Sequence, residues 1–111
     1  MNMKADVVIV GTGVSGLFAA LNLPRDRKII LITKSDAESS DSFLAQGGIS
    51  VMRDEEDYSL YFEDTMRAGH YENRRESVDI MIRSSRDIIS DLVGYGVRFE
   101  KRDGGPAFTR E

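Results

Sequence analysis

The sequence predicts an α/β fold, in which two parallel strands are joined by a helix and followed by two further helices. Apolar runs rich in β-branched residues occupy 7–10 and 29–32, and such runs are typical of strands buried on both faces of a parallel sheet. A glycine-rich stretch at 11–16 follows the first run, and the apolar segment 17–23 then predicts a helix. The order strand, helix, strand predicts a right-handed crossover.

The first predicted helix ends before Pro24, because proline cannot donate the backbone hydrogen bond that would continue it. The polar turn 25–28 leads into the second strand. The segment from Thr33 to Gly48 is rich in Ser, Asp and Gly and predicts irregular structure. Loops of this length are uncommon unless they bind a ligand or move, so this segment is a candidate for ligand binding.

Two amphipathic helices are predicted after this segment. The first spans Asp57 to Ala68, with Gly69 as its stop, and the second runs from about Arg75 to Val93. His70 follows the first helix, and we interpret this lone histidine as structural or solvated. The apolar face of the second helix repeats at i, i+3, i+4 and i+7. Its members are Val78, Met81, Ile82, Ser85, Ile88, Ile89 and Leu92.

The ends of the second helix and the residues after it carry local signals. Asn73 and Glu76 could form a capping box at its start, and Gly94 suits a left-handed position after its end. A short strand is expected at 97–100 and a turn at 104–106.

The composition excludes several classes of function. There are 15 Lys and Arg residues against 19 Asp and Glu, a formal net charge of −4, so no basic surface for nucleic acid is expected. The sequence has no cysteine, which excludes disulfides and thiolate metal sites within it and permits a reducing compartment. Its apolar runs are too short to cross a bilayer. We expect a cytoplasmic protein with no metal, membrane or nucleic-acid partner.

The glycine-rich stretch is Gly11-Thr12-Gly13-Val14-Ser15-Gly16, with the spacing G-x-G-x-x-G. Its place between a strand and a helix predicts a Rossmann-like dinucleotide-binding loop. Gly11 permits the tight turn out of the strand, Gly13 lets the backbone approach a pyrophosphate, and Gly16 lets the helix pack against the strand. The helix N-terminus then presents N–H groups and a positive dipole end to the phosphates. A glycine-rich turn without a ligand is the alternative.

The end of the second strand carries Thr33-Lys34-Ser35, where a typical NAD-binding domain carries an acid that binds the ribose hydroxyls. A lysine ammonium cannot accept a hydrogen bond from a hydroxyl, so a standard NAD site is disfavoured. Lys34 could instead meet a phosphate or line an adenosine pocket. A solvated lysine at a strand end is the alternative.

Several stretches resemble the flavoprotein family of succinate dehydrogenase, fumarate reductase and L-aspartate oxidase. The sequence S-F-L-A-Q-G-G-I at 42–49 is similar to the family's A-Q-G-G-I segment, and L-I-T-K at 31–34 matches as well. F-E-D-T-M-R-A-G at 62–69 resembles the family's E-D-T-x-x-A-G helix. T-R-E at 109–111 resembles the start of the T-R-E-G-x-H-S motif of the aspartate oxidases. These matches follow in order across nearly the whole chain.

The resemblance implies FAD as the cofactor. The pyrophosphate loop would be 12–15, Lys34 would lie at the adenosine end, and 41–48 would wrap the flavin. Backbone N–H groups at Gly47 and Gly48 would lie close to the isoalloxazine ring. The implied cofactor-binding residues are Gly11, Thr12, Gly13, Val14, Ser15, Gly16, Lys34, Asp41, Ser42, Phe43, Leu44, Ala45, Gln46, Gly47 and Gly48.

Two positions distinguish branches of this family. Succinate dehydrogenases carry a histidine that bonds covalently to the flavin where this chain has Asp41, so the resemblance implies non-covalent FAD. Aspartate oxidases often carry serine or asparagine there, and a carboxylate would disfavour an anionic reduced flavin. At the position of Glu111, the aspartate oxidases carry a glutamate that faces the substrate's amino group. A carboxylate favours a cationic ammonium and repels a dianionic succinate.

The resemblance thus implies FAD-dependent oxidation of L-aspartate to iminoaspartate, with oxygen or fumarate as electron acceptor, in the first step of NAD biosynthesis. The alternatives are a flavoprotein subunit of fumarate reductase or succinate dehydrogenase, and a catalytically incompetent nucleotide-binding fragment. With 111 residues, the chain has room for one small domain at most. We therefore expect 1–111 to be the N-terminal portion of an FAD-binding domain, with an incomplete fold. The rest of that domain, the substrate-capping domain and the catalytic residues would lie outside it, so this piece alone should be inactive.

Overall fold

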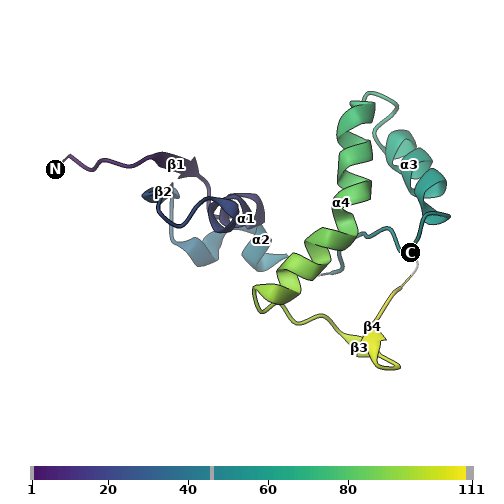
Figure 1. Cartoon of the computed structure of the whole chain (residues 1–111). Coiled ribbons are helices and arrows are strands. Elements are labelled where there is room, and N and C mark those ends of the chain that lie inside the picture. The colour runs from purple at the N-terminus through teal and green to yellow at the C-terminus, as the bar shows by residue number, and fades with distance from the viewer. Residues whose placement is uncertain (1, 46, 110–111) are drawn as a thin grey trace. The chain divides into compact units, whose positions relative to one another are not determined.

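The computed structural model describes residues 2–45 and 47–109, which divide into two compact units, 1–48 and 49–111 (Figure 1). The first unit holds a small parallel sheet with its crossover helix, and the second holds two long helices and a hairpin. None of the described helices combines the length and the hydropathy that crossing a membrane requires.

The β-α-β unit predicted from the sequence is confirmed. Strand β1 (Val7–Val10) pairs in parallel with strand β2 (Ile29–Ile32), and helix α1 (Val14–Asn22) connects them. The helix begins three residues before the predicted Leu17, because the second half of the glycine motif forms its first turn. It ends one residue before Leu23, whose N–H bonds to the Ala20 carbonyl at 3.3 Å, and Pro24 then prevents a further turn.

The prediction that both strands are buried on both faces is wrong for the described chain. Val8 is 54% exposed, Val10 is 83% exposed and Ile32 is 48% exposed. The sheet has two strands, and α1 is the helix that packs against β1. One crossover helix cannot cover both faces of a sheet, so apolar side chains of the strands stay in contact with solvent.

The segment 33–48, which was predicted to be irregular, contains two short helices. They are η1 (Ala37–Ser39), a 3-10 helix, and α2 (Asp41–Leu44). Each begins with a side-chain cap: Asp36 accepts from the Glu38 N–H at 3.0 Å, and Ser40 accepts from the Phe43 N–H at 3.2 Å. Asp and Ser at these positions are standard N-cap residues, so the sequence carried a signal for these turns.

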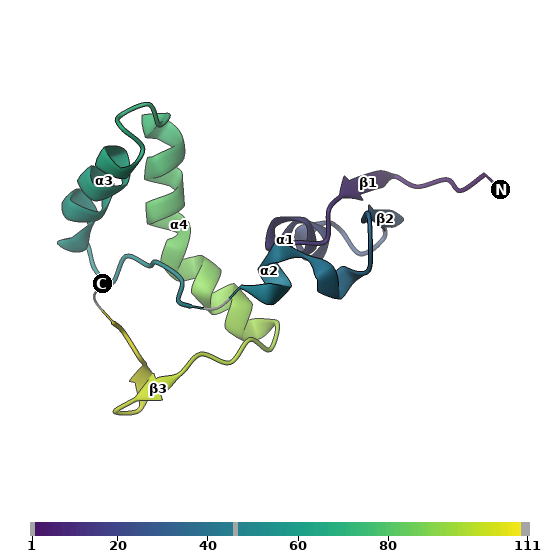
Figure 2. The ribbon, with the colours of Figure 1, turned by 180° about the vertical axis from the view of Figure 1, so that it is seen from behind.

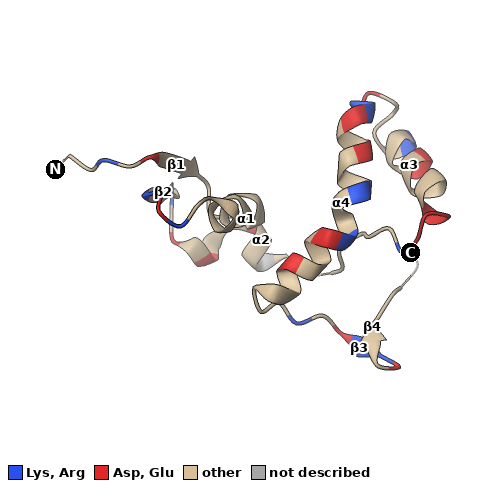
Figure 3. Cartoon of the chain, in the orientation of Figure 1, with Lys and Arg blue, Asp and Glu red and all other residues tan. Residues whose placement is uncertain are grey.

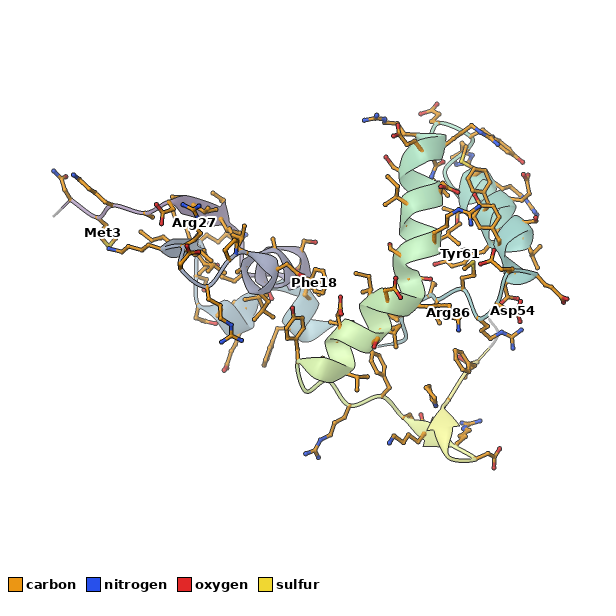
Figure 4. The ribbon with its side chains drawn as sticks, in the orientation of Figure 1. Met3, Phe18, Arg27, Asp54, Tyr61 and Arg86 are labelled. Carbon is orange, nitrogen blue, oxygen red and sulfur yellow. The ribbon has the colours of Figure 1, made fainter. Side chains whose placement is uncertain are left out.

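The second unit is built on helices α3 (Asp57–Ala68) and α4 (Arg75–Gly94), which confirms both predicted helices. Before α3, the Asp54 carboxylate accepts from the N–H groups of Glu56 and Asp57 at 3.0 and 3.1 Å (Figure 4). Among the residues whose burial is described, the buried apolar ones are Met52, Met66, Val78 and Ile82, and the aromatic residues Tyr58, Tyr61 and Phe62 of α3 pack against them.

Both predicted caps of α4 are wrong. The N-cap is Arg74, with no side-chain cap, and Asn73 lies one residue earlier. The Asn73 side chain packs against Gly69 so closely that a Cβ there would overlap its amide group. At the other end Gly94 belongs to the helix, and the left-handed position falls to Gly96, whose φ is +98°.

The end of the described chain forms a hairpin, where the sequence predicted a short strand at 97–100 and a turn at 104–106. Strand β3 (Lys101–Arg102) pairs antiparallel with strand β4 (Gly105–Pro106), while 97–100 is not a strand. Asp103 and Gly104 form the turn with φ values of +51° and +81°. An Asp-Gly pair with both φ values positive is the usual two-residue hairpin turn, and this dipeptide was the signal that the prediction overlooked.

Candidate functional site

The glycine loop leaves the sheet through a conformation that requires glycine. Gly11 has a φ of +107°, a region that side-chain-bearing residues rarely adopt. Its N–H donates to the Ile32 carbonyl at 2.7 Å, which extends the strand pairing by one bond before the chain turns away. The predicted role of Gly11 in a tight turn is therefore confirmed.

Gly16 allows the close contact between α1 and β1. A Cβ at this position would overlap the carbonyl oxygen of Gly11 and would lie 3.3 Å from Ile9 Cγ2. The Gly11 backbone is also held to β2 by the hydrogen bond from its N–H to the Ile32 carbonyl. The sequence-based interpretation of Gly16 as a packing glycine is confirmed.

The space beside Gly13 is taken by a side chain from the segment predicted to wrap the flavin. A Cβ on Gly13 would lie 3.2 Å from Ser42 Oγ. The same Oγ accepts a hydrogen bond from the Val14 N–H at 3.0 Å, across 28 positions of sequence. Helices α1 and α2 accordingly lie side by side in both views (Figures 1 and 2). The structure thus brings two of the predicted cofactor-binding segments together.

The N-terminus of α1 has the properties of an anion-binding site. Its N-cap residue, Gly13, has no side chain to cap the helix, and no acidic residue occupies the first turn. Thr12 is only 8% exposed, and its Oγ1 has no hydrogen-bond partner among the described residues. The first-turn N–H groups other than that of Val14, the positive helix end and an orphaned hydroxyl are groups that an anion such as a pyrophosphate satisfies. These residues therefore fit the diphosphate of a dinucleotide.

Lys34 is exposed in the bend that follows β2. The next acid along the chain, Asp36, is engaged in local structure, because it accepts hydrogen bonds from Ser39 Oγ at 2.8 Å and from the Glu38 N–H. The Ser39 hydroxyl is the main reason why the pKa of Asp36 lies below its ordinary value. Asp36 is thus a capping residue and does not replace the ribose-binding acid that the sequence lacks at the end of the strand.

The remaining predicted site residues are distributed over and beyond α2. Asp41, Ser42 and Phe43 are exposed on this helix, which ends at Leu44, and Ala45 is its C-cap. Gly47 has a φ of +127°, which explains the need for glycine at this position. Gly48 follows it and is exposed. The predicted residues Gln46 and Glu111 lie outside the described residues.

A polar cluster that the sequence analysis missed joins α3 to α4. The Tyr58 hydroxyl donates to the Asp79 carboxylate, and Arg83 Nε donates to the same oxygen at 2.9 Å. The Arg83 guanidinium also lies over the Tyr58 ring, 4.3 Å from its centre. The Tyr58 hydroxyl, followed by Arg83, lowers the pKa of Asp79, and hydrogen bonding to Asp79 raises the pKa of Tyr58. Figure 3 shows the charged residues that line α4.

This cluster fastens two helices and forms no recognisable reaction centre. Its side chains bond to one another. Tyr58 and Asp79 are 21 positions apart in the sequence and lie on different helices, while Asp79 and Arg83 are 4 positions apart on α4, so no pattern within a single helix predicts the whole cluster. Among the described residues, no group of three or more His, Asp or Glu side chains is arranged to hold a metal ion.

Comparison with known proteins identifies a family. The model of the family described as FAD binding domain matches residues 6–110. The chain is 47% identical over 111 residues to the L-aspartate oxidase of Clostridium perfringens, covering 100% of this chain and 25% of that protein. It is 46% identical over 112 residues to that of Clostridium acetobutylicum, covering 100% of this chain and 26% of that protein. With the L-aspartate oxidase of Synechocystis it shares 36% identity over 107 residues, or 96% of this chain and 19% of that protein. The chain therefore spans about a quarter of the length of the first two relatives.

Proposed function

Because the chain belongs to the FAD binding domain family, we propose that it forms the N-terminal part of an L-aspartate oxidase. The observation that carries this proposal is the identity of 46 to 47% with relatives of that name over the whole chain. The proposed reaction is the oxidation of L-aspartate to iminoaspartate, in the first step of NAD biosynthesis. Oxygen or fumarate would be the electron acceptor.

FAD, when bound, supplies the redox chemistry by accepting two electrons and a proton from the substrate as a hydride equivalent. The residues of this chain would hold that cofactor in place. The loop 11–16 would bind the pyrophosphate, Lys34 would lie at the adenosine end, and 41–48 would wrap the flavin. The N-terminus of α1, which has no acidic residue in its first turn, and the orphaned hydroxyl of Thr12 support the first of these assignments.

The flavin is proposed to be bound without a covalent link. Asp41 stands where the covalent branch of the family carries its flavin-linked histidine, and a carboxylate does not supply that imidazole nitrogen. Acid precipitation of the full-length protein tests this, because released FAD would colour the supernatant. Flavin retained in the pellet would contradict the proposal.

We also propose that Glu111 faces the substrate's ammonium group and that no catalytic residue lies in 1–111. The rest of the FAD-binding domain and a substrate-capping domain would then be supplied by further chain. Glu111→Gln in the full-length enzyme should raise the KM for aspartate, because it removes a charge opposite to that of the ammonium. A cytoplasmic location, which the cysteine-free sequence permits, remains part of this proposal.

The reaction itself is tested with the purified full-length protein. A yellow preparation that forms hydrogen peroxide in the presence of L-aspartate and oxygen would support the proposal. Succinate is the matched control substrate, because it has the same two carboxylates and lacks the amino group. Oxidation of succinate without oxidation of aspartate would favour a dicarboxylate dehydrogenase and would contradict the proposal.

A further inference from the structure

A groove lies in the second unit between helix α4, helix α3 and the residues that precede α3. It has a volume of about 340 Å³, and none of the described residues that line it is charged. The groove shares no residue with the cluster of Tyr58, Asp79 and Arg83 or with the glycine loop, so neither accounts for it. Its apolar and aromatic lining consists of Ile49, Tyr61, Met81, Ile88 and Ile89.

Helix α4 extends beyond the helix that packs against it. Its 20 residues rise over roughly 30 Å, whereas the 12 residues of α3 rise over roughly 18 Å. Val78 and Ile82 are buried in the part of α4 that faces α3, and the C-terminal part of α4 extends past α3 in both views (Figures 1 and 2). The apolar stripe continues along this part as Ile88 and Ile89. Helix α3 therefore leaves part of the apolar face of α4 without a helical partner.

The hydroxyl groups that α4 contributes to the groove are already hydrogen-bonded within the second unit. Ser84 Oγ donates to the Ile80 carbonyl at 2.7 Å. Ser85 Oγ donates to the Ile82 carbonyl at 2.6 Å and accepts from the Met52 N–H at 3.0 Å. These serines need no outside partner, so the α4 side of the groove offers apolar surface to an occupant. An aliphatic or aromatic side chain is the occupant that this chemistry fits.

We propose that this groove is filled by an apolar segment of the same protein that follows Glu111 in the full-length chain. The inference rests on the proposed function, because it requires 1–111 to be part of a longer protein. The whole of 1–111 matches only 25% of the L-aspartate oxidase of Clostridium perfringens, so a protein of that kind has ample further chain to cover the groove.

The size of the groove favours an occupant from the same chain over a separate protein. Eight described residues line it, whereas a stable interface between two proteins uses about 20 to 30 residues on each side. A segment of the same chain needs fewer contacts, because it is already held near the groove and loses less translational freedom on docking. A second copy of the protein and residues 1–48 are the rival occupants.

The first experiment compares thiol alkylation at two positions of α4 in the full-length protein. Met81 lines the groove and is 46% exposed, while Ile80 is 60% exposed and does not line it. An open groove would leave Met81→Cys and Ile80→Cys similarly reactive. In a filled groove, Met81→Cys should be alkylated at least about ten-fold more slowly, because a covered thiol reacts only when the packing opens. Alkylation of Met81→Cys as fast as that of Ile80→Cys, measured by mass spectrometry of each peptide, would overturn the proposal.

The second experiment identifies the occupant by photo-crosslinking. The photoreactive amino acid p-benzoylphenylalanine replaces Met81 in the full-length protein, and the same replacement of Ile80 is the control. Crosslinks from position 81 to residues beyond Glu111 of the same molecule are expected, with few or none from position 80. Crosslinks to 1–48, or to a second copy in a yield that rises with protein concentration, would overturn the proposal. If the replacement of Met81 prevents folding, Ser50, which is exposed and also lines the groove, carries the photoreactive group instead.

Neither measurement depends on catalytic activity, so the two proposals fail separately. A full-length protein that oxidises aspartate but crosslinks elsewhere would contradict this inference alone. A protein that crosslinks as expected but does not oxidise aspartate would contradict only the proposed reaction.

Discussion

Each of the three glycines of the loop suits its position for a different physical reason. Gly11 is needed for its backbone angle and Gly16 for the contact of α1 with the strand, while a Cβ on Gly13 would lie tightly against the Ser42 hydroxyl. The sequence motif predicts the first two reasons correctly. The approach of Ser42 to Gly13 involves residues 29 positions apart, and a local motif contains no information about such a contact.

Replacement of Gly16 by alanine should destabilise the first unit. The new Cβ would overlap the Gly11 carbonyl, and relief of an overlap in a packed region typically costs about 1–3 kcal/mol. Gly94→Ala is the control, because Gly94 lies in α4 with open space at the Cβ position. It should be neutral or slightly stabilising. Urea unfolding of both variants measures the difference, and equal stabilities would contradict this account of Gly16.

The Asp79 carboxylate should make the second unit sensitive to acid. Its pKa is lowered in the folded state by the Tyr58 hydroxyl and then by Arg83. A carboxyl with a lower folded pKa adds stability above its unfolded pKa, and this stability is lost as the pH falls through the folded value. Wild-type protein should therefore lose free energy of unfolding below about pH 4, and Asp79→Asn should lose less over the same interval.

Urea unfolding between about pH 6 and pH 2 checks this prediction. Asp87→Asn is the matched control, because Asp87 is exposed on the same helix and has no ion pair among the described residues. Its free energy of unfolding should fall with decreasing pH as steeply as that of the wild type. If the free energy of unfolding of Asp79→Asn also falls as steeply as that of the wild type, the cluster does not contribute to the pH dependence of stability.

At the scale of elements, α3 and α4 pack through one face each, as their periodicity predicts. The predicted apolar face of α4 is only partly buried, since Val78, Ile82 and Ser85 are buried while Met81 is 46% exposed. Ser85 is the polar member of this face, and its Oγ accepts from the Met52 N–H at 3.0 Å and donates to the Ile82 carbonyl at 2.6 Å. The side chain thus satisfies a buried backbone group that precedes α3.

Truncation of the Ile82 side chain should strongly weaken the packing of α3 against α4. It is 0% exposed, and truncation of a fully buried isoleucine to alanine typically costs about 2–5 kcal/mol. Ile80 lies on the same helix and is 60% exposed, so Ile80→Ala should change stability by about 0.5 kcal/mol or less. Thermal or urea unfolding of the two variants compares them directly. Similar costs would contradict the assignment of Ile82 to the core.

At the scale of the whole molecule, the two units differ in how well they bury their apolar residues. The second unit has an apolar core between two long helices. The first has a two-stranded sheet, whose Val10 is 83% exposed. Two-stranded sheets are marginally stable unless further strands or helices cover them. The glycine loop therefore rests on the less stable part of the described chain.

The 111-residue chain alone should bind FAD weakly or not at all. Its glycine loop depends on this small sheet, and much of the enclosure of a flavin would have to come from further chain. Titration of FAD into the isolated chain, followed by flavin fluorescence, measures this, with the full-length protein as the control. Tight stoichiometric binding by the isolated chain would contradict the expectation and would show that it is a functional module by itself.

The sequence by itself determined the β-α-β order, both long helices and the family, because periodicity, glycine spacing and ordered motifs are encoded in neighbouring residues. It also predicted the geometric roles of Gly11 and Gly16. Only the tertiary structure decided that Ser42 caps α1 and that Tyr58, Asp79 and Arg83 join α3 to α4. It also moved the left-handed position from Gly94 to Gly96 and placed the hairpin at 101–106. Hydrogen bonds between distant segments depend on how the elements pack, and no local pattern records that packing.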